Sequence, residues 1–292
     1  MFFGLTEEQE MIVETVRSFV ENEIYPHESL VESEGFVPIE IAQDIKQKCI
    51  NLGFYACNFP ENIGGAGLNH LDFSLVEREL GRGSMALTHF FGRPQNILMA
   101  CKNDQIEKYL LPAVRGEVMD ALAMTEPDAG SDVRGMKCFA KSEGSDWIIN
   151  GTKHFISGAE HADFIIVFIA TGEEQTERGP KKKITAFLVD RGTPGFVIRD
   201  GYHSVSHKGY KNMILEFDDC LLPKEQVLGE VDGGFEVMNT WLYATRLTVA
   251  AMSVGRARRC FDYALNYSAE RKQFGQQIGK FQGVSYQLAD MI

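Results

Sequence analysis

The sequence has few of the features that mark membrane-spanning, disulfide-bonded or nucleic-acid-binding proteins. Its longest uninterrupted apolar run, Phe164–Ala170, is far shorter than the ~20 residues that cross a bilayer. Its six cysteines are scattered without a CxxC pair, which argues against a disulfide framework or a zinc site. Lysine and arginine number 29 against 41 acidic residues, a net charge of −12, which argues against a main role in binding DNA or RNA.

Two further absences bear on where the protein resides. Residues 1–10 have neither the basic start nor the small-residue cleavage pattern of a secretory signal peptide. The scattered cysteines fit a reducing compartment. We therefore expect a cytoplasmic protein with no membrane span, no nucleic-acid partner and no metal site.

The first part of the chain carries helical signals, and we expect residues 1–118 to form an N-terminal α-helical domain. Thr6 and Gln9 have the spacing of a capping box, and apolar residues then recur at helical intervals until Pro26, which we expect to end the helix. Similar patterns predict helices over 38–52, 71–80, 84–101 and 105–111, with a glycine-rich loop over 59–67.

The pattern changes near Met119. Short β-prone runs separated by glycines predict a middle antiparallel β-barrel over residues 119–230. Helical periodicity returns after Gly233 and Gly234, so residues 231–292 are expected to begin a C-terminal α-helical bundle. Two long helices seldom bury their apolar faces alone and Ile292 follows no stop signal, so we expect this bundle to be incomplete. The predicted fold class is α+β multidomain.

The segment 123–135, where helices give way to strands, is the most informative for function. Thr125 and Ser131 offer hydroxyl groups, and Gly130 lets a backbone approach a ligand closely. Such a turn can aim successive N–H groups at an anion or at ring oxygens, but a polar turn between domains has the same composition. Residue chemistry leaves both interpretations open. We expect Glu126 to stabilise the turn itself.

A collinear series of motifs extends this signal over essentially the whole chain. The segment Met124–Gly135 resembles the signature of the flavin-dependent acyl-CoA dehydrogenase family. Further segments resemble that family in the same order: 60–67, 109–117, 150–157, 217–223, 233–235, 270–275 and 281–282. The resemblance implies FAD as cofactor and an acyl-CoA thioester as substrate.

The family's roles can be carried over to matching positions. The resemblance implies that the flavin is bound by Met124, Thr125, Gly130, Ser131, Phe155, Ile156, Ser157, Arg271, Phe274 and Gln282, the last three from a neighbouring protomer. It implies that Ser131, Tyr243 and Arg246 contact the substrate. From residue chemistry alone, Phe155 is equally an ordinary buried strand residue. For Arg246 the competing interpretation is simple helix solvation, and a Glu-Arg-Lys run such as the one containing Arg271 is more often a solvated helix face. Phe155 stands where the family usually has tryptophan.

The implied reaction is α,β-dehydrogenation of an acyl-CoA, with a hydride passing to flavin N5 and electrons to an electron-transfer flavoprotein. The family's glutamate base is expected beyond residue 292. Glu77, Glu79, Glu126 and Glu236 are available carboxylates that no motif nominates. The resemblance further implies a role in fatty acid metabolism and a homotetramer or homodimer.

Two alternatives share the architecture. One is an oxygen-using flavin oxidase, of the acyl-CoA oxidase or nitroalkane-oxidase type. The other is a truncated, non-catalytic relative in which the fold survives as a binding or assembly module; retention of Thr125, Ser131 and Arg271 counts against it.

Overall fold

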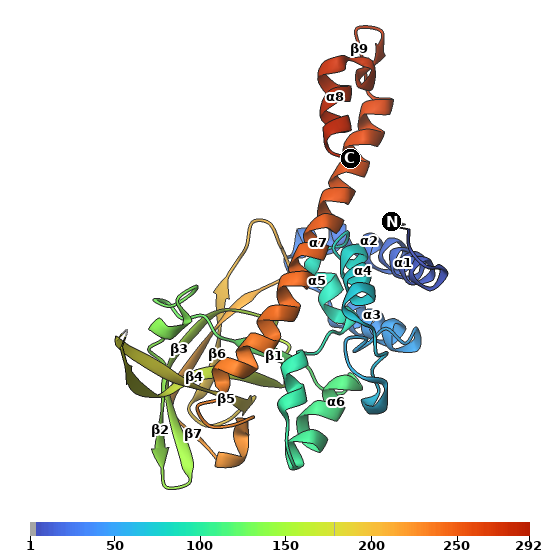
Figure 1. Ribbon diagram of the computed structural model, residues 1–292. Helices are drawn as coiled ribbons and strands as arrows, with labels where there is room; N and C mark the ends of the chain where they lie inside the picture. Colours follow the sequence, from blue (N-terminus) through green and yellow to red (C-terminus); the bar gives the residue numbers. More distant parts are fainter. Residues whose placement is uncertain (1–3, 178) are drawn as a thin grey trace.

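The computed structural model describes residues 4–177 and 179–292. It arranges them as a helical domain, a curled β-sheet and a long C-terminal helix that projects beyond both (Figure 1). The predicted fold class is confirmed. Residues 1–3, on which part of the signal-peptide argument falls, lie outside the described residues. Within the described ranges, no helix combines the length and apolar character needed to traverse a bilayer.

The helical domain starts as the sequence predicts. Thr6 and Gln9 form the capping box before α1 (Glu7–Phe19), and α3 (Ile39–Asn51) and α4 (His70–Leu80) follow the expected patterns. The expected stop at Pro26 is wrong. A π-helical segment, η1 (Val20–Ile24), leads directly into α2 (Tyr25–Glu34), and Pro26 lies in the first turn of α2, so the chain stays helical past the proline.

The helix predicted over 84–101 is also wrong. The structure has three short pieces, α5 (Met85–Thr88), η3 (His89–Phe91) and η4 (Asn96–Ala100), with a non-helical stretch between the last two. Gly92 has φ +81°, and a Cβ added there would lie 1.8 Å from the Tyr55 ring. This close contact breaks the helix at a place that periodicity cannot reveal. The remaining elements here are η2 (Glu61–Ile63), η5 (Ile106–Leu110) and α6 (Leu111–Val114).

The middle of the chain forms one eight-stranded sheet. The strands are β1 (Asp120–Ala123), β2 (Phe139–Glu143), β3 (Asp146–Ser157), β4 (Phe164–Thr176), β5 (Gly179–Asp190), β6 (Phe196–Tyr202), β7 (Asn212–Leu222) and β8 (Val227–Leu228). Their order is β6-β7-β3-β2-β4-β5-β8, with β1 beside β4. Most pairs are antiparallel as expected, but β1 and β2 both pair with β4 in parallel.

Strand β4 explains the long apolar run of the sequence. Phe164, Ile166 and Phe168 pack into the core shared with the helical domain. The alternate residues Ile165 and Val167 pack into the core inside the curled sheet. Because successive side chains of a strand point to opposite faces, a strand buried on both faces is apolar throughout. The run therefore marks where the sheet meets the helical domain.

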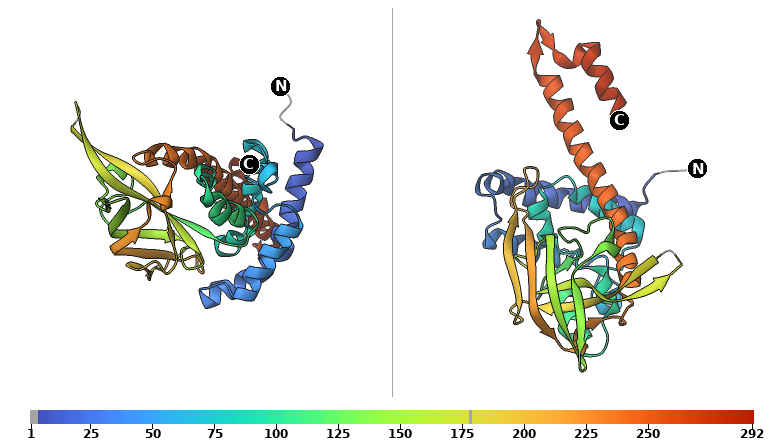
Figure 2. Two further views of the ribbon diagram at one scale, coloured as in Figure 1. Left: turned by 90° about the horizontal axis from the view of Figure 1, so that it is seen from below. Right: turned by 90° about the vertical axis from the view of Figure 1, so that its left-hand side faces the viewer.

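Helix α7 (Gly234–Glu270) links the parts of the molecule. It starts against β5, crosses α4 and then continues beyond the body (Figure 1; Figure 2). At the crossing, a Cβ added to Gly255 would lie 1.9 Å from the Arg78 carbonyl oxygen, and one added to Gly81 would lie 2.3 Å from the Met252 carbonyl oxygen. Two glycines therefore allow the backbones of α4 and α7 to touch.

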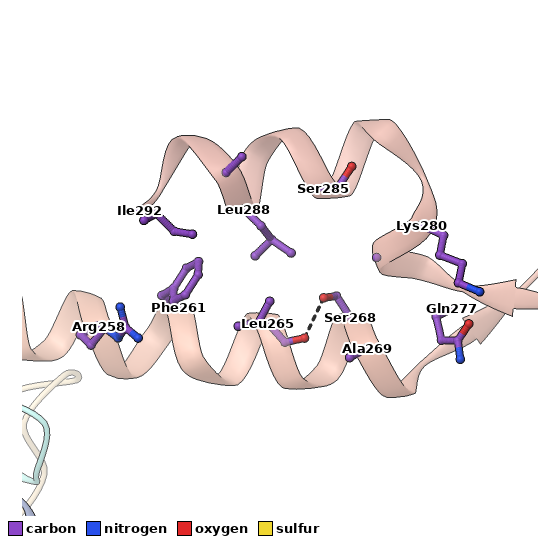
Figure 3. Close-up of a pocket in the computed structure, with 12 residues that line it drawn as sticks. Arg258, Phe261, Leu265, Ser268, Ala269, Gln277, Lys280, Ser285, Leu288 and Ile292 are labelled. Atoms are coloured by element: carbon purple, nitrogen blue, oxygen red, sulfur yellow. Dashed lines mark hydrogen bonds between the residues drawn. The ribbon is translucent and has the colours of Figure 1, made fainter.

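The projecting part of α7 carries a small return structure, which we call the arm, residues 258–292. A hairpin of β9 (Lys272–Gln273) and β10 (Gln276–Gln277) turns the chain, and η8 (Ile278–Lys280) leads to α8 (Gln282–Asp290). Phe261 and Leu265 of α7 face Leu288 and Ile292 across a hollow of about 700 Å³ (Figure 3). This hollow is mostly apolar and contains none of the predicted site residues.

Candidate active-site cleft

A cleft of about 590 Å³ lies where the sheet, the helical domain and α7 meet. Five of the predicted flavin-contacting residues line it: Met124, Thr125, Phe155, Ile156 and Ser157. The opposite wall comes from α4, from the non-helical stretch 92–95 and from the first half of α7. Segments far apart in the sequence thus enclose one concave site, the usual form of a binding site for a small molecule.

The turn that carries Thr125 is fixed by a buried ion pair. Lys153 and Glu126 are both fully buried or nearly so, with Lys153 Nζ 2.7 Å from Glu126 Oε1. Lys153 Nζ also donates to the Met124 carbonyl at 3.0 Å. The Glu126 carboxylate accepts the backbone N–H groups of Lys137 and Cys138. Glu126 therefore stabilises its own turn, as the sequence predicts.

The charge of Glu126 follows from these contacts. Burial alone would raise the pKa of its carboxyl group. The Lys153 ammonium and the two backbone N–H donors outweigh burial and lower that pKa below its usual value. Glu126 is therefore ionised at neutral pH and stays paired. A carboxylate engaged in this way supports the position of Met124 and Thr125 and does not serve as a free base.

Phe155 is turned outward by an irregularity in β3. The register of β3 against β7 shifts between Lys153 and Ile156, and Phe155 has φ +57°. A bulge of this kind re-aims side chains, and the left-handed conformation is strained for an aromatic residue. Phe155 is 49% exposed, and its ring lies 4.3 Å from the Tyr202 ring, centroid to centroid. The cleft thus has a flat aromatic face at its sheet wall.

The neighbouring residues complete this wall. The His154 N–H donates to the Thr125 carbonyl at 2.9 Å, which ties the turn to β3. Ile156 is buried, and the Ser157 hydroxyl donates to Asn212 Oδ1 at 2.9 Å. That bond leaves the Ser157 oxygen able to accept.

Helix α7 closes the cleft from the other side. Trp241 Nε1 donates to Gln95 Oε1 at 2.6 Å, which fastens α7 to the non-helical stretch of the helical domain. Ala244, Thr245, Thr248 and Val249 follow along the same lining. Thr245 carries no group that could remove a carbon-bound proton at neutral pH.

The other predicted residues lie outside the cleft lining. Gly130 and Ser131 are exposed in the loop after the Thr125 turn. Tyr243 and Arg246 are exposed on α7, with the Arg246 guanidinium 5.9 Å from the centre of the Tyr243 ring. The last three, Arg271, Phe274 and Gln282, are exposed on the arm, where Phe274 is 94% exposed.

The structure adds polar residues that no motif identified. Glu77 on α4 is fully buried yet lines the cleft, and its Oε1 lies 3.3 Å from Arg93 Nε. Burial raises the pKa of Glu77, and the Arg93 guanidinium opposes that rise. His89 lines the same wall; burial first, then Arg93 and His161, lower its pKa to about 3, so its ring is neutral. Glu77 alone had a signal in the sequence, as a charged residue beside the apolar Leu75, Val76 and Leu80 of its helix.

Asp120, at the start of β1, lines the cleft and is expected to make the stability of the folded protein depend on pH. It accepts the Gln95 N–H at 3.2 Å, but burial raises the pKa of its carboxyl group to about 7. A group whose pKa rises on folding stabilises the fold at low pH, and that contribution is lost as pH rises through the folded-state value. Asp120→Asn cannot ionise, so it should stabilise the protein relative to wild type more at pH 8 than at pH 5, by about 1–3 kcal/mol. Thermal unfolding midpoints of both proteins at the two pH values measure this difference; an unchanged difference would contradict it.

Comparison with known proteins identifies the family. Three domain profiles match the chain in order: the acyl-CoA dehydrogenase N-terminal domain over residues 6–117, the middle domain over 121–220 and the C-terminal domain over 232–292. Together they define a three-part oxidoreductase. The chain belongs to the acyl-CoA dehydrogenase family, as the sequence motifs predicted.

Individual relatives support the same family assignment. The probable acyl-CoA dehydrogenase YngJ of Bacillus subtilis is 32% identical, over 100% of this chain and 76% of its own. The caffeyl-CoA reductase-Etf complex subunit CarC of Acetobacterium woodii is 34% identical, with the same two coverages. Among solved structures, butyryl-CoA dehydrogenase from Megasphaera elsdenii has a TM-score of 0.88 at 31% identity, over 100% of this chain and 76% of that one. An FAD complex of PigA has a TM-score of 0.87 at 28% identity, with the same coverages.

Proposed function

We propose that this protein uses FAD to dehydrogenate an acyl-CoA thioester between its α and β carbons. The observation that carries the proposal is the cleft, because its sheet wall is built from the residues that match the family's flavin contacts. Bound FAD would supply the oxidising chemistry by accepting the hydride that leaves the β carbon.

The residues of the sheet wall fit such a group. Phe155 is an aromatic face held outward in a strained conformation, and a flat ring system packed on it would remove that face from water. Thr125 lies beside it on a turn that the Lys153 ion pair immobilises. In the proposed complex, the Thr125 hydroxyl and neighbouring backbone orient the ring, and α7 excludes water from the opposite side.

The distance between the arm and its own cleft supports a role for the arm in the cleft of a second copy of the chain. From Thr245 in the cleft lining to Arg271 beyond the end of α7 is a rise of roughly 39 Å along one helix. Arg271, Phe274 and Gln282 are therefore too distant to complete their own chain's cleft. We propose that they contact the flavin of a neighbouring protomer, in a homodimer or homotetramer, where the Arg271 guanidinium would pair with the diphosphate.

The remaining parts of the proposal concern partners and location. CarC is named as a subunit of a complex with an electron-transfer flavoprotein. By similarity, we propose an electron-transfer flavoprotein as the electron acceptor, fatty acid metabolism as the role and the cytoplasm as the compartment.

Removing the Thr125 hydroxyl tests the cofactor assignment directly. Thr125→Val keeps the side-chain shape but loses one hydrogen bond, so the dissociation constant for FAD should rise about 3- to 10-fold. Flavin fluorescence quenching during titration of the apoprotein measures it. Thr152→Val, on β3 but outside the cleft lining, is the matched control and should bind FAD like wild type. A protein that binds no FAD, or equal weakening by both variants, would refute the assignment.

A further inference from the structure

The Glu77–Arg93 pair is an unusual feature of the cleft wall. Glu77 is fully buried and the Arg93 side chain is 17% exposed. Within residues 4–177 and 179–292, neither carboxylate oxygen of Glu77 accepts a hydrogen bond, and Arg93 Nη1 donates none. A buried carboxylate without donors is costly, since hydrogen bonds normally offset its loss of water. Both residues line the cleft, so the pair leaves unsatisfied acceptors and an unsatisfied donor buried in its wall.

Asn58 extends the same polar surface. Asn58 also lines the cleft; its Nδ2 donates to the Pro94 carbonyl at 3.1 Å, whereas its buried Oδ1 has no partner among the described residues. The three side chains together offer acceptors at Glu77 and Asn58 and one donor at Arg93. A complementary group must therefore both donate and accept hydrogen bonds.

The charges around the Glu77–Arg93 pair limit which kind of ligand group can bind there. Arg93 balances Glu77, the neighbouring His89 ring is neutral, and Asp120 adds a further carboxyl group to the lining. A ligand carboxylate would place another negative charge beside Glu77 with one guanidinium to serve both. A ligand ammonium would leave Arg93 unpaired and repelled. A neutral donor–acceptor group satisfies the site without adding charge.

We propose that Glu77 and Arg93 select an acyl group that carries a neutral hydroxyl or carboxamide on its chain, in preference to a plain hydrocarbon chain. The group donates to Glu77 and accepts from Arg93 Nη1. This inference rests on the proposed function, since it assumes that an acyl-CoA occupies the cleft.

Binding measurements on the FAD-loaded protein test this proposal. The probes are hexanoyl-CoA, 6-hydroxyhexanoyl-CoA, 6-amino-6-oxohexanoyl-CoA and adipyl-CoA, with the eight-carbon set as a second length, titrated by calorimetry. At one length or the other, the hydroxy or carboxamide thioester should bind about tenfold or more tightly than the unsubstituted one, because hydrogen bonds to charged groups are strong. The double variant Glu77→Leu with Arg93→Met should lose that preference and bind the unsubstituted thioester at least as well as wild type.

A second ion pair supplies the matched control. Arg115 Nε lies 2.8 Å from Glu117 Oε1 on the exposed surface, outside the cleft lining, so Arg115→Met with Glu117→Leu should keep the wild-type preference. Equal or tighter binding of the unsubstituted thioesters at both lengths, or tightest binding of the dicarboxylic thioester, would overturn the inference while leaving the proposed function intact. Binding of no thioester at all would instead overturn the proposed function, and the inference with it.

Discussion

Replacing Lys153 by methionine is expected to destabilise the protein by about 3–5 kcal/mol, the usual cost of leaving one partner of a buried ion pair uncompensated. Glu126 would keep its two backbone donors but lose the ammonium that lies 2.7 Å away. The Met124 carbonyl would lose its donor as well. Urea unfolding followed by circular dichroism measures the loss, and FAD affinity should fall with it because the Thr125 turn is released.

An exposed lysine whose backbone N–H also bonds to Glu126 provides the comparison. Lys137 Nζ lies 2.6 Å from Asp128 Oδ2, but both side chains are largely exposed. Exposed pairs contribute little, so Lys137→Met should cost less than about 1 kcal/mol. If Lys153→Met proved as mild as Lys137→Met, the buried pair would not be what fixes the turn.

A methyl group at Gly255 is expected to force α4 and α7 apart. Its Cβ would fall 1.9 Å from the Arg78 carbonyl oxygen, and backbone cannot move aside as a flexible side chain can. Gly283→Ala, on α8 with no atom within 4 Å of the new Cβ, isolates the gain in helix propensity. Gly255→Ala should therefore be less stable than Gly283→Ala by about 2–4 kcal/mol.

The same unfolding experiment decides the outcome. If the two alanine variants unfold at the same urea concentration, the crossing tolerates a side chain and the helices are not in backbone contact. Because Trp241 on α7 also lines the cleft, a separation of the helices should additionally weaken FAD binding in Gly255→Ala but not in Gly283→Ala.

Local patterns predicted the parts of the fold that depend on neighbours in sequence. The capping box at Thr6, the amphipathic helices α3 and α4 and the β-prone runs from Asp120 to Leu222 are all present. The errors at Pro26 and over 84–101 have a different origin. The first error lies next to a π-helical segment through which the helix continues, and the close approach of Gly92 to Tyr55 accounts for the second. That close approach is packing between distant segments, which periodicity does not report.

The site residues likewise fall into those that sequence motifs predicted and those that only the folded structure shows. Motif resemblance nominated Thr125, Phe155 and Ser157, and the structure places them on one cleft wall. It could not nominate Arg93, which lines the cleft because the chain leaves the helical path after Gly92. Nor could it pair Arg93 with Glu77, since α4 and the non-helical stretch 92–95 meet only in the folded chain. Residues held by tertiary contacts alone are invisible until the chain is folded.

The unbroken course of α7 has a mechanical consequence. The helix contains no proline and runs unbroken from Thr245 in the cleft lining, past the crossing at Gly255, to Glu270. At the standard rise, Thr245 and Glu270 lie roughly 15 Å and 22 Å from Gly255 along the helix axis. Trp241 bonds to Gln95 on one side of the crossing and Arg259 bonds to Glu28 on the other, so the helical domain holds the rod on both sides and the arm stands at a fixed distance from the cleft.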